Sequence, residues 1–141
     1  MKKFYKPKII SKDKRGIFYD ICNVNFKNVS IITSKKNTIR SNHYHLKDAH
    51  YIYVLQGKMK YYYTKINNIK IKTKILNPGD IVYTPPLEIH TTKFLLDSII
   101  LVISKHKRSK KFYESDTIRY ELIKWNNIKK LINADCVKAI H

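Results

Sequence analysis

Four of the six histidines lie in two short stretches of the chain, and their spacing allows the imidazole rings to meet. His43 and His45 are two residues apart, so in an extended segment both side chains leave the same face of a sheet. His50 opens the next apolar segment, and a turn over residues 46–49 can return it to the pair. His90 follows a Pro-Pro corner, whose fixed φ angles make its position rigid. We therefore expect the four side chains to line one cavity.

A cluster of neutral imidazoles on rigid strands supports two kinds of chemistry. It suits a borderline divalent metal such as Zn, Fe, Ni, Cu or Mn, with His43, His45, His50 and His90 as ligands. An imidazole also has a pKa of about 6.5, close to what a general base needs, and without a metal the candidate bases are His45 and His90. A metal ligand cannot also be the free base, so the metal-bound and metal-free versions both stay open. No organic cofactor is expected.

Other side chains are candidates for the same site. Returning a proton to carbon needs an acid, and the tyrosines on segments near the histidines are Tyr44, Tyr51, Tyr53, Tyr61, Tyr63 and Tyr83. We select Tyr53 and Tyr83 as the candidate acids. Arg40 and Lys93 are the candidates to meet an anionic part of a substrate through charge-assisted hydrogen bonds.

Strands must position these residues, because short segments rich in Ile, Val and Tyr recur between turn signals, which is typical of a sandwich or barrel. We predict an all-β fold with strands at residues 17–20, 24–33, 38–42, 50–55, 58–65, 69–76, 81–84, 90–94 and 98–104. Residues 69–75 alternate Ile or Thr with Lys, which predicts one dry and one solvated face. Apolar residues then recur every three or four positions over 122–132, which predicts a C-terminal amphipathic helix.

The length of 141 residues fits a single domain, with a barrel over about 17–104 and an extension and helix over about 112–134. The net charge of +19 comes from lysines spread along the whole chain. Such a field attracts anionic small molecules, whereas nucleic acid is not an expected partner. The densest basic run, residues 105–111, is expected to be an exposed loop first and an anion contact second.

Two widely separated cysteines, Cys22 and Cys136, do not form a disulfide framework. The N-terminus lacks the apolar run of a secretory signal, and the longest apolar stretch is only of strand length. These features predict a cytoplasmic protein with no membrane partner.

The histidine-bearing segments carry a family resemblance. Residues 37–57 resemble the first cupin motif, G-x5-H-x-H-x3,4-E-x6-G, through His43, His45, His50 and Gly57. Residues 79–94 resemble the second, G-x5-P-x-G-x2-H-x3-N, through Gly79, Pro85 and His90. The substituted motif positions are Asn37 and Leu87 for Gly, His50 for Glu, and Phe94 for Asn. The resemblance implies a cupin double-stranded β-helix, also called a jelly-roll barrel.

Among cupins, the sequence resembles small sugar-nucleotide epimerases and ketoisomerases of surface-polysaccharide biosynthesis. The stretch TIRSNHYHLKDAHYIYVLQGKMKYYY is similar to the C-terminal cupin of capsular-polysaccharide epimerase/reductases. Arg40, His43 and His45 resemble the R-G-x-H-x-H pattern of dTDP-4-keto-6-deoxyhexose ketoisomerases, with Ser41 in place of Gly and His50 in place of their Gln.

This resemblance implies an enzyme that isomerises or epimerises a 4-keto sugar nucleotide by removing the proton next to the ketone. Two alternatives stay open: a non-catalytic cupin that binds a metal or a sugar, and a metal-dependent oxygenase. Because cupins commonly pair through strand edges, the resemblance also implies a homodimer, with the predicted strand 24–33 as the pairing edge.

Overall fold

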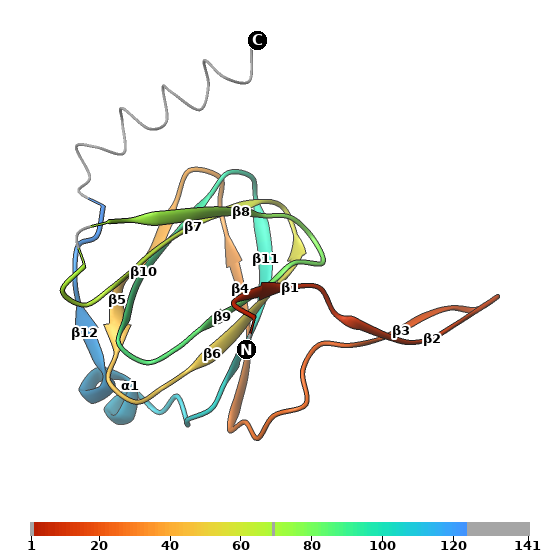
Figure 1. Cartoon of the computed structure of the whole chain (residues 1–141), viewed down its shortest axis with the longest axis horizontal. Helices are drawn as coiled ribbons and strands as arrows, with labels where there is room; N and C mark the ends of the chain where they lie inside the picture. Colours follow the sequence, from red (N-terminus) through yellow and green to blue (C-terminus); the bar gives the residue numbers. More distant parts are fainter. Residues whose placement is uncertain (1, 69, 124–141) are drawn as a thin grey trace, which may run out of the picture.

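The computed structural model describes residues 2–68 and 70–123, and all structural statements concern these residues (Figure 1). The elements are β1 (Phe4–Tyr5), β2 (Lys8–Asp13), β3 (Gly16–Asp20), β4 (Asn28–Ser34), β5 (Ile39–His45), β6 (His50–Gln56), β7 (Met59–Lys65), β8 (Lys72–Leu76), β9 (Ile81–Thr84), β10 (Glu88–Phe94), β11 (Ser98–Ser104), α1 (Lys110–Asp116) and β12 (Thr117–Arg119). No helix in this part of the chain is long and apolar enough to cross a membrane.

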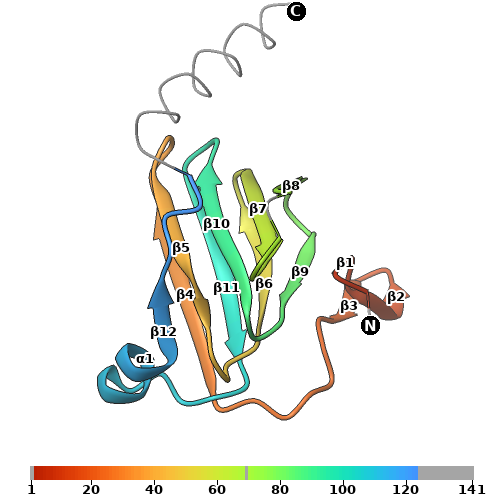
Figure 2. The same ribbon diagram turned by 60° about the vertical axis from the view of Figure 1, so that its left-hand side comes forward.

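Two five-stranded sheets form the barrel, with strand orders β1-β9-β6-β11-β4 and β12-β5-β10-β7-β8 (Figure 2). Every strand pair between described residues is antiparallel. The strands β2 and β3 form a separate hairpin that projects away from the barrel (Figure 1). The prediction of an all-β jelly roll is therefore confirmed.

The main hydrophobic core lies between the two sheets, where strands of both send alternate side chains inward. Its buried members are Ile52, Val54, Met59, Tyr61, Leu76, Val82, Phe94, Ile100 and Val102. A second cluster of Tyr51, Ile81 and Ile103 lies outside the first sheet, against partly buried residues of the segment 21–24. The sheet containing β6 is thus packed on both faces, and its inner face opens toward the histidines.

Several details of the predicted strands were wrong. The strand expected over 24–33 begins only at Asn28, and the one expected over 69–76 begins at Lys72. The expected dry face of the latter is absent, because β8 lies at a sheet edge and leaves Ile75 46% exposed. The helix predicted over 122–132 falls almost entirely outside the described residues.

The helix α1 was not predicted, although its start has a recognisable signal. The Ser109 side chain accepts a hydrogen bond from the Phe112 backbone N–H, which caps the first turn. The helix α1 follows β11 and lies at one end of the two sheets, next to β12 (Figure 2).

Three non-glycine residues adopt left-handed backbone conformations at positions where the resembled cupin motifs have glycine. They are Asn37, Ser41 and Leu87, with φ angles of 67°, 77° and 62°. At the third position, the Leu87 N–H donates a 2.8 Å hydrogen bond to the His45 carbonyl oxygen. The backbone at these positions thus adopts a conformation that glycine reaches without strain, although the residues present carry side chains.

Replacing Leu87 with glycine should therefore stabilise the protein. The side chain is 49% exposed, so little packing is lost. Relief of the left-handed strain outweighs the extra chain entropy of glycine, and we expect the free energy of unfolding to rise by about 0.5–1 kcal/mol. Urea unfolding of Leu87→Gly measures this. The control Leu96→Gly, at a residue 48% exposed and without positive φ, should destabilise the fold. Equal losses in both variants would contradict the expectation.

Candidate functional site

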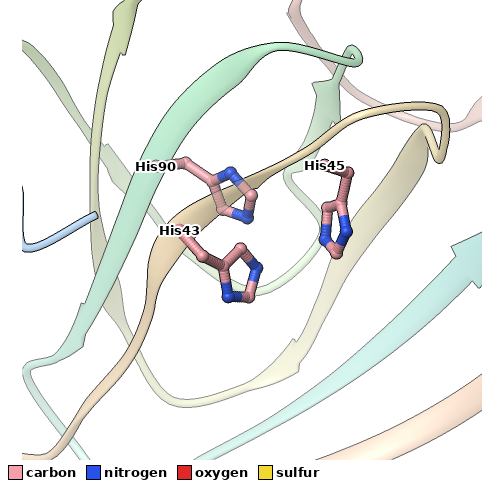
Figure 3. A group of neighbouring side chains, drawn as sticks. All are labelled: His43, His45 and His90. Atoms are coloured by element: carbon pink, nitrogen blue, oxygen red, sulfur yellow. The ribbon is translucent and has the colours of Figure 1, made fainter. Parts of the chain in front are cut away.

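The structure brings the four predicted histidines together inside the barrel. His43 and His45 come from β5, His90 from the adjacent β10, and His50 from β6 in the facing sheet. The ring centroids of His43 lie 4.7 Å from His45 and 4.8 Å from His90. The His50 ring lies 5.4 Å from His45 and 5.3 Å from His90. Figure 3 shows the rings of His43, His45 and His90 turned toward a common point.

A β-bulge in β5 aims the side chains at the cavity. His90 pairs with His43, but the next residue, Thr91, pairs with Ser41, so Asn42 is the extra residue on β5. Ser41 and Asn42 both have positive φ angles, of 77° and 54°. In a regular strand, residues three apart face opposite sides, whereas here both Arg40 and His43 line the cavity.

Burial keeps the imidazoles uncharged at neutral pH. His45, His50 and His90 are at most 3% exposed. Desolvation, together with repulsion from neighbouring rings and arginines, lowers the pKa of His43 to about 2. Desolvation lowers the pKa of His90 to about 3 and also lowers those of His45 and His50. All four rings are therefore neutral at neutral pH.

Hydrogen-bond partners set which ring nitrogens remain available. The His90 Nδ1–H donates to the Glu88 carbonyl oxygen at 3.0 Å, which leaves Nε2 for a ligand. The His45 Nδ1 lies 3.5 Å from the Asp116 carboxylate and 3.3 Å from the Thr117 hydroxyl. Its Nε2, like the Nδ1 of His50, is buried and has no hydrogen-bond partner among the described residues. An orphaned buried nitrogen in a cluster of this kind is costly and points to a ligand.

The cavity has a volume of about 140 Å³ and lies between the sheets. Its polar lining residues are Arg40, Ser41, His43, His50, His90, Thr92, Arg108 and Tyr113. Its apolar lining residues are Ile32, Ile52, Phe94, Ile100 and Val102. The lining thus combines an apolar wall with imidazoles and guanidinium groups. His45 lies next to His43 and His50 but is not part of this lining, so the expectation that all four histidines line the cavity is wrong for His45.

The other predicted site residues lie in different places. Arg40 lines the cavity, and its guanidinium donates to the Ser34 hydroxyl at 2.7 Å and the Thr33 carbonyl at 3.1 Å. Lys93 is buried and does not line the cavity, because it lies three residues from His90 on a regular part of β10 and so on the opposite face. The expectation that Lys93 meets a substrate is therefore wrong.

The two predicted tyrosine acids are also misplaced. Tyr53 and Tyr83 belong to the cluster outside the first sheet, packed around Tyr51 and Ile81. Alternate residues of β6 face opposite sides, so Tyr53 points away from the cavity that His50 faces. This placement contradicts the expectation that either tyrosine reaches the histidine cluster.

Sequence reasoning missed two residues that do line the cavity, Arg108 and Tyr113. The Tyr113 ring centroid lies 5.9 Å from that of His45 and 6.3 Å from that of His43. The Arg108 guanidinium lies 5.6 Å from the Tyr113 ring centroid and 3.8 Å from the Asp48 carboxylate. One signal was present, since Arg108 is one of only four arginines in a lysine-rich chain and interrupts a run of lysines.

Three of the histidines fit a divalent metal. One donor atom each of His43, His45 and His90 lies within 4.8 Å of the others. Tetrahedral Zn–N bonds would bring such atoms to about 3.4 Å from one another, so modest side-chain rotations suffice. All three rings are neutral. The Asp116 carboxylate lies 3.5 Å from Nδ1 of His45, and metal-bound histidines commonly have a carboxylate at the ring nitrogen that does not bind the metal. His50 is not part of this set.

Residues 23–114 match the cupin family. The chain belongs to the cupin family. This cupin is similar to a double mutant of the 3,4-ketoisomerase QdtA from Thermoanaerobacterium thermosaccharolyticum in complex with TDP, with 28% identity, 82% of this chain and 85% of that chain covered, and a TM-score of 0.67. It is also similar to a single mutant of QdtA in complex with TDP-4-keto-6-deoxyglucose, with 25% identity, the same 82% and 85% coverage, and a TM-score of 0.68.

The cupin is also similar in fold to dTDP-4-dehydrorhamnose 3,5-epimerase from Sulfolobus tokodaii. That likeness has 23% identity, 86% of this chain and 79% of that chain covered, and a TM-score of 0.68. No curated protein matches the sequence significantly. The predicted resemblance to sugar-nucleotide ketoisomerase and epimerase cupins is therefore confirmed.

The neutral state of His90 predicts acid sensitivity of the metal-free cupin. The folded-state pKa is about 3 against an ordinary 6.5, so the unfolded chain takes up a proton in this window that the folded chain does not. This contribution to stability is present above pH 6.5 and is lost as the pH falls toward 3. The free energy of unfolding should therefore fall less steeply with decreasing pH in His90→Gln than in the wild type. The difference between the two slopes should be up to about 1.4 kcal/mol per pH unit. Urea unfolding from neutral pH downward measures both slopes, and equal slopes would contradict the expectation.

Proposed function

We propose that this cupin is a sugar-nucleotide isomerase or epimerase. It removes the proton next to the ketone of a 4-keto sugar nucleotide and returns a proton to carbon, which yields the isomeric sugar. The similarity to QdtA, at comparable chain length, supports this assignment. The observation that carries it is the buried Nε2 of His45, which makes no hydrogen bond with any residue that the structure describes and lies beside the cavity histidines.

In this proposal His45 is the base. Its Nε2 lone pair is free to accept a proton, and the Asp116 carboxylate beside Nδ1 stabilises the imidazolium that results. Asp116 is itself held in place, because its carboxylate accepts the backbone N–H groups of Lys47 and Asp48 at 2.8 and 3.1 Å. The carboxylate therefore both orients His45 and compensates the charge that forms on it.

His90 is the second proton carrier. Its ring lies 5.9 Å from that of His45, and its Nδ1–H is committed to the Glu88 carbonyl. The neutral ring therefore presents only an acceptor nitrogen to the cavity. Nε2 of His90 can therefore take up the proton of the hydroxyl group on the carbon that His45 has deprotonated. The proton that His45 has removed is then returned from its Nε2 to the neighbouring carbon.

The developing oxyanion needs a donor, and Tyr113 and Arg108 are the groups in reach. Both line the cavity, and the guanidinium stacked near the ring favours negative charge there. We assign the acid role to Tyr113 in place of the two tyrosines selected from the sequence. Arg40, exposed on the cavity wall, is the proposed partner of the substrate diphosphate.

A divalent metal is compatible with the same residues. His43, His45 and His90 would hold it, and it would supply Lewis-acid polarisation of the ketone. His45 would then be a ligand and the base would have to come from elsewhere. The metal is proposed as an alternative version of the site, with Zn, Fe, Mn or Ni as candidates.

We also propose that the cupin forms a homodimer. The strand β4 lies at the edge of its sheet and leaves Ile31 66% exposed. The hairpin of β2 and β3 leaves Phe18 61% exposed, and an isolated two-stranded hairpin is at best marginally stable in water. A second copy of the chain would cover both surfaces.

We keep the cytoplasm as the proposed compartment of this cupin.

Deuterium wash-in tests the reaction directly. In heavy water, the cupin should introduce deuterium next to the ketone of at least one dTDP-, UDP- or GDP-4-keto sugar. His45→Asn should slow the exchange by about 10²–10⁴-fold, because it removes the proton acceptor. His106→Asn is a matched control, since the His106 ring stacks on Phe112 outside the cavity lining and the variant should keep full activity.

Failure of exchange with every sugar would overturn the proposed function and favour the metal- or sugar-binding cupin. Exchange that stops after chelation and returns with one added metal would select the metal version. Oxygen consumption with a metal present, in the absence of exchange, would select the oxygenase.

Dimerisation is tested by sedimentation of variants. Phe18→Lys, in the projecting hairpin, should shift the cupin from dimer to monomer, because a charge cannot enter an apolar contact. Phe26→Lys alters a phenylalanine outside the hairpin that is 53% exposed and should leave the dimer intact. A wild-type protein that sediments as a monomer would contradict the proposal.

A further inference from the structure

A buried charge network lies behind His90 and outside the cavity lining. The Lys3 ammonium contacts the Glu88 carboxylate and donates a 2.8 Å hydrogen bond to the Tyr83 carbonyl oxygen. The Tyr61 hydroxyl donates to the same carboxylate at 3.0 Å and shares a 2.7 Å hydrogen bond with the Thr84 hydroxyl. Lys3 thus connects the N-terminal segment to the start of β10.

This network contacts His90 in two ways, both through Glu88. The Glu88 main-chain oxygen accepts the His90 Nδ1–H. The Glu88 side chain holds Tyr61, whose ring stacks on the His90 imidazole with a centroid distance of 6.0 Å and an interplanar angle of 17°. One residue therefore governs both the tautomer and the plane of the ring.

The carboxylate needs its partner because it is only 7% exposed. Removing one member of a buried ion pair leaves an uncompensated charge, which costs more than the pair itself contributes. Without Lys3, the Glu88 side chain must either leave its position or take up a proton, and in both cases its hydrogen bond from the Tyr61 hydroxyl weakens. The Tyr61 ring then holds the plane of the imidazole less firmly. Rotation of that plane weakens the hydrogen bond from Nδ1–H to the Glu88 main-chain oxygen, although the β10 backbone keeps that oxygen in place.

We infer that Lys3 and Glu88 are positioning residues for His90. The ion pair holds the Tyr61 ring parallel to the imidazole and so keeps the proton on Nδ1, which leaves Nε2 facing the cavity as an acceptor. None of Lys3, Tyr61 and Glu88 lines the cavity, so their effect on the reaction is indirect. The catalytic consequence of this inference rests on the proposed function, whereas the positioning of the ring does not.

The test compares Lys3→Met with Lys2→Met, a matched change at an exposed neighbouring lysine. Long-range ¹⁵N–¹H NMR spectra of the metal-free, histidine-labelled full chain report which nitrogen of His90 carries the proton. We expect the Nδ1–H form in the wild type and in Lys2→Met, and a mixture with the Nε2–H form in Lys3→Met. The same variant should lower kcat by about tenfold to a hundredfold with KM nearly unchanged.

A second variant separates positioning from general loss of stability. Lys3→Met/Glu88→Gln buries no charge, and its amide oxygen can still accept from Tyr61, so the Nδ1–H form and most of kcat should return. A Lys3→Met protein with the wild-type His90 spectrum, or a double variant whose spectrum stays mixed, overturns the inference. If Lys3→Met does not fold, Tyr61→Phe is measured in its place. This variant should show both the Nδ1–H and the Nε2–H form of His90, whereas the double variant should show only the Nδ1–H form. If no variant, the wild type included, acts on a 4-keto sugar, the proposed function fails while the spectra still decide the positioning.

Discussion

The burial of imidazole rings between two sheets is the constraint on which this structure depends. A histidine removed from water is stable only when neutral, and a neutral ring must place its single N–H on an acceptor. The Glu88 carbonyl provides that acceptor for His90, and the Asp116 carboxylate lies on the corresponding side of His45. The consequence is a cluster of neutral imidazoles in which His43, His50 and His90 line the cavity and His45 lies beside them. Both metal binding and proton abstraction require nitrogen lone pairs gathered in this way.

The barrel meets this constraint with a locally irregular strand. The bulge at Asn42 places Arg40 on the same side as His43, so a cation and an imidazole share the cavity wall. Ser41 and Leu87 adopt left-handed backbone conformations at positions where the resembled motifs have glycine. Strain of this kind, concentrated beside a cluster of buried polar groups, is typical of functional sites.

The sequence was sufficient for the fold and for the histidine cluster, because both follow from two-residue periodicity and from motif spacing. The same periodicity would have excluded Tyr53, which is three residues from His50, and Lys93, which is three residues from His90. Those errors were avoidable. The bulge that lets Arg40 break this rule was not predictable, since nothing in the local sequence specifies where a strand gains an extra residue.

Long-range contributions could not be read from the sequence. Tyr113 and Arg108 reach the cavity only because the chain turns back after β11 into α1, a helix that begins at the end of the basic run 105–111. Lys3 and Glu88 are 85 positions apart, and their pairing depends on how β1 joins the edge of its sheet. Such contacts arise from tertiary packing, which local patterns do not encode.

The most direct test of the central claim is a structure of the cupin with a bound 4-keto sugar nucleotide. The account predicts the carbon next to the ketone within about 3–3.5 Å of Nε2 of His45 or His90, with the diphosphate at the arginines of the cavity wall. A sugar bound outside the barrel, or imidazoles that turn away from it, would contradict the account.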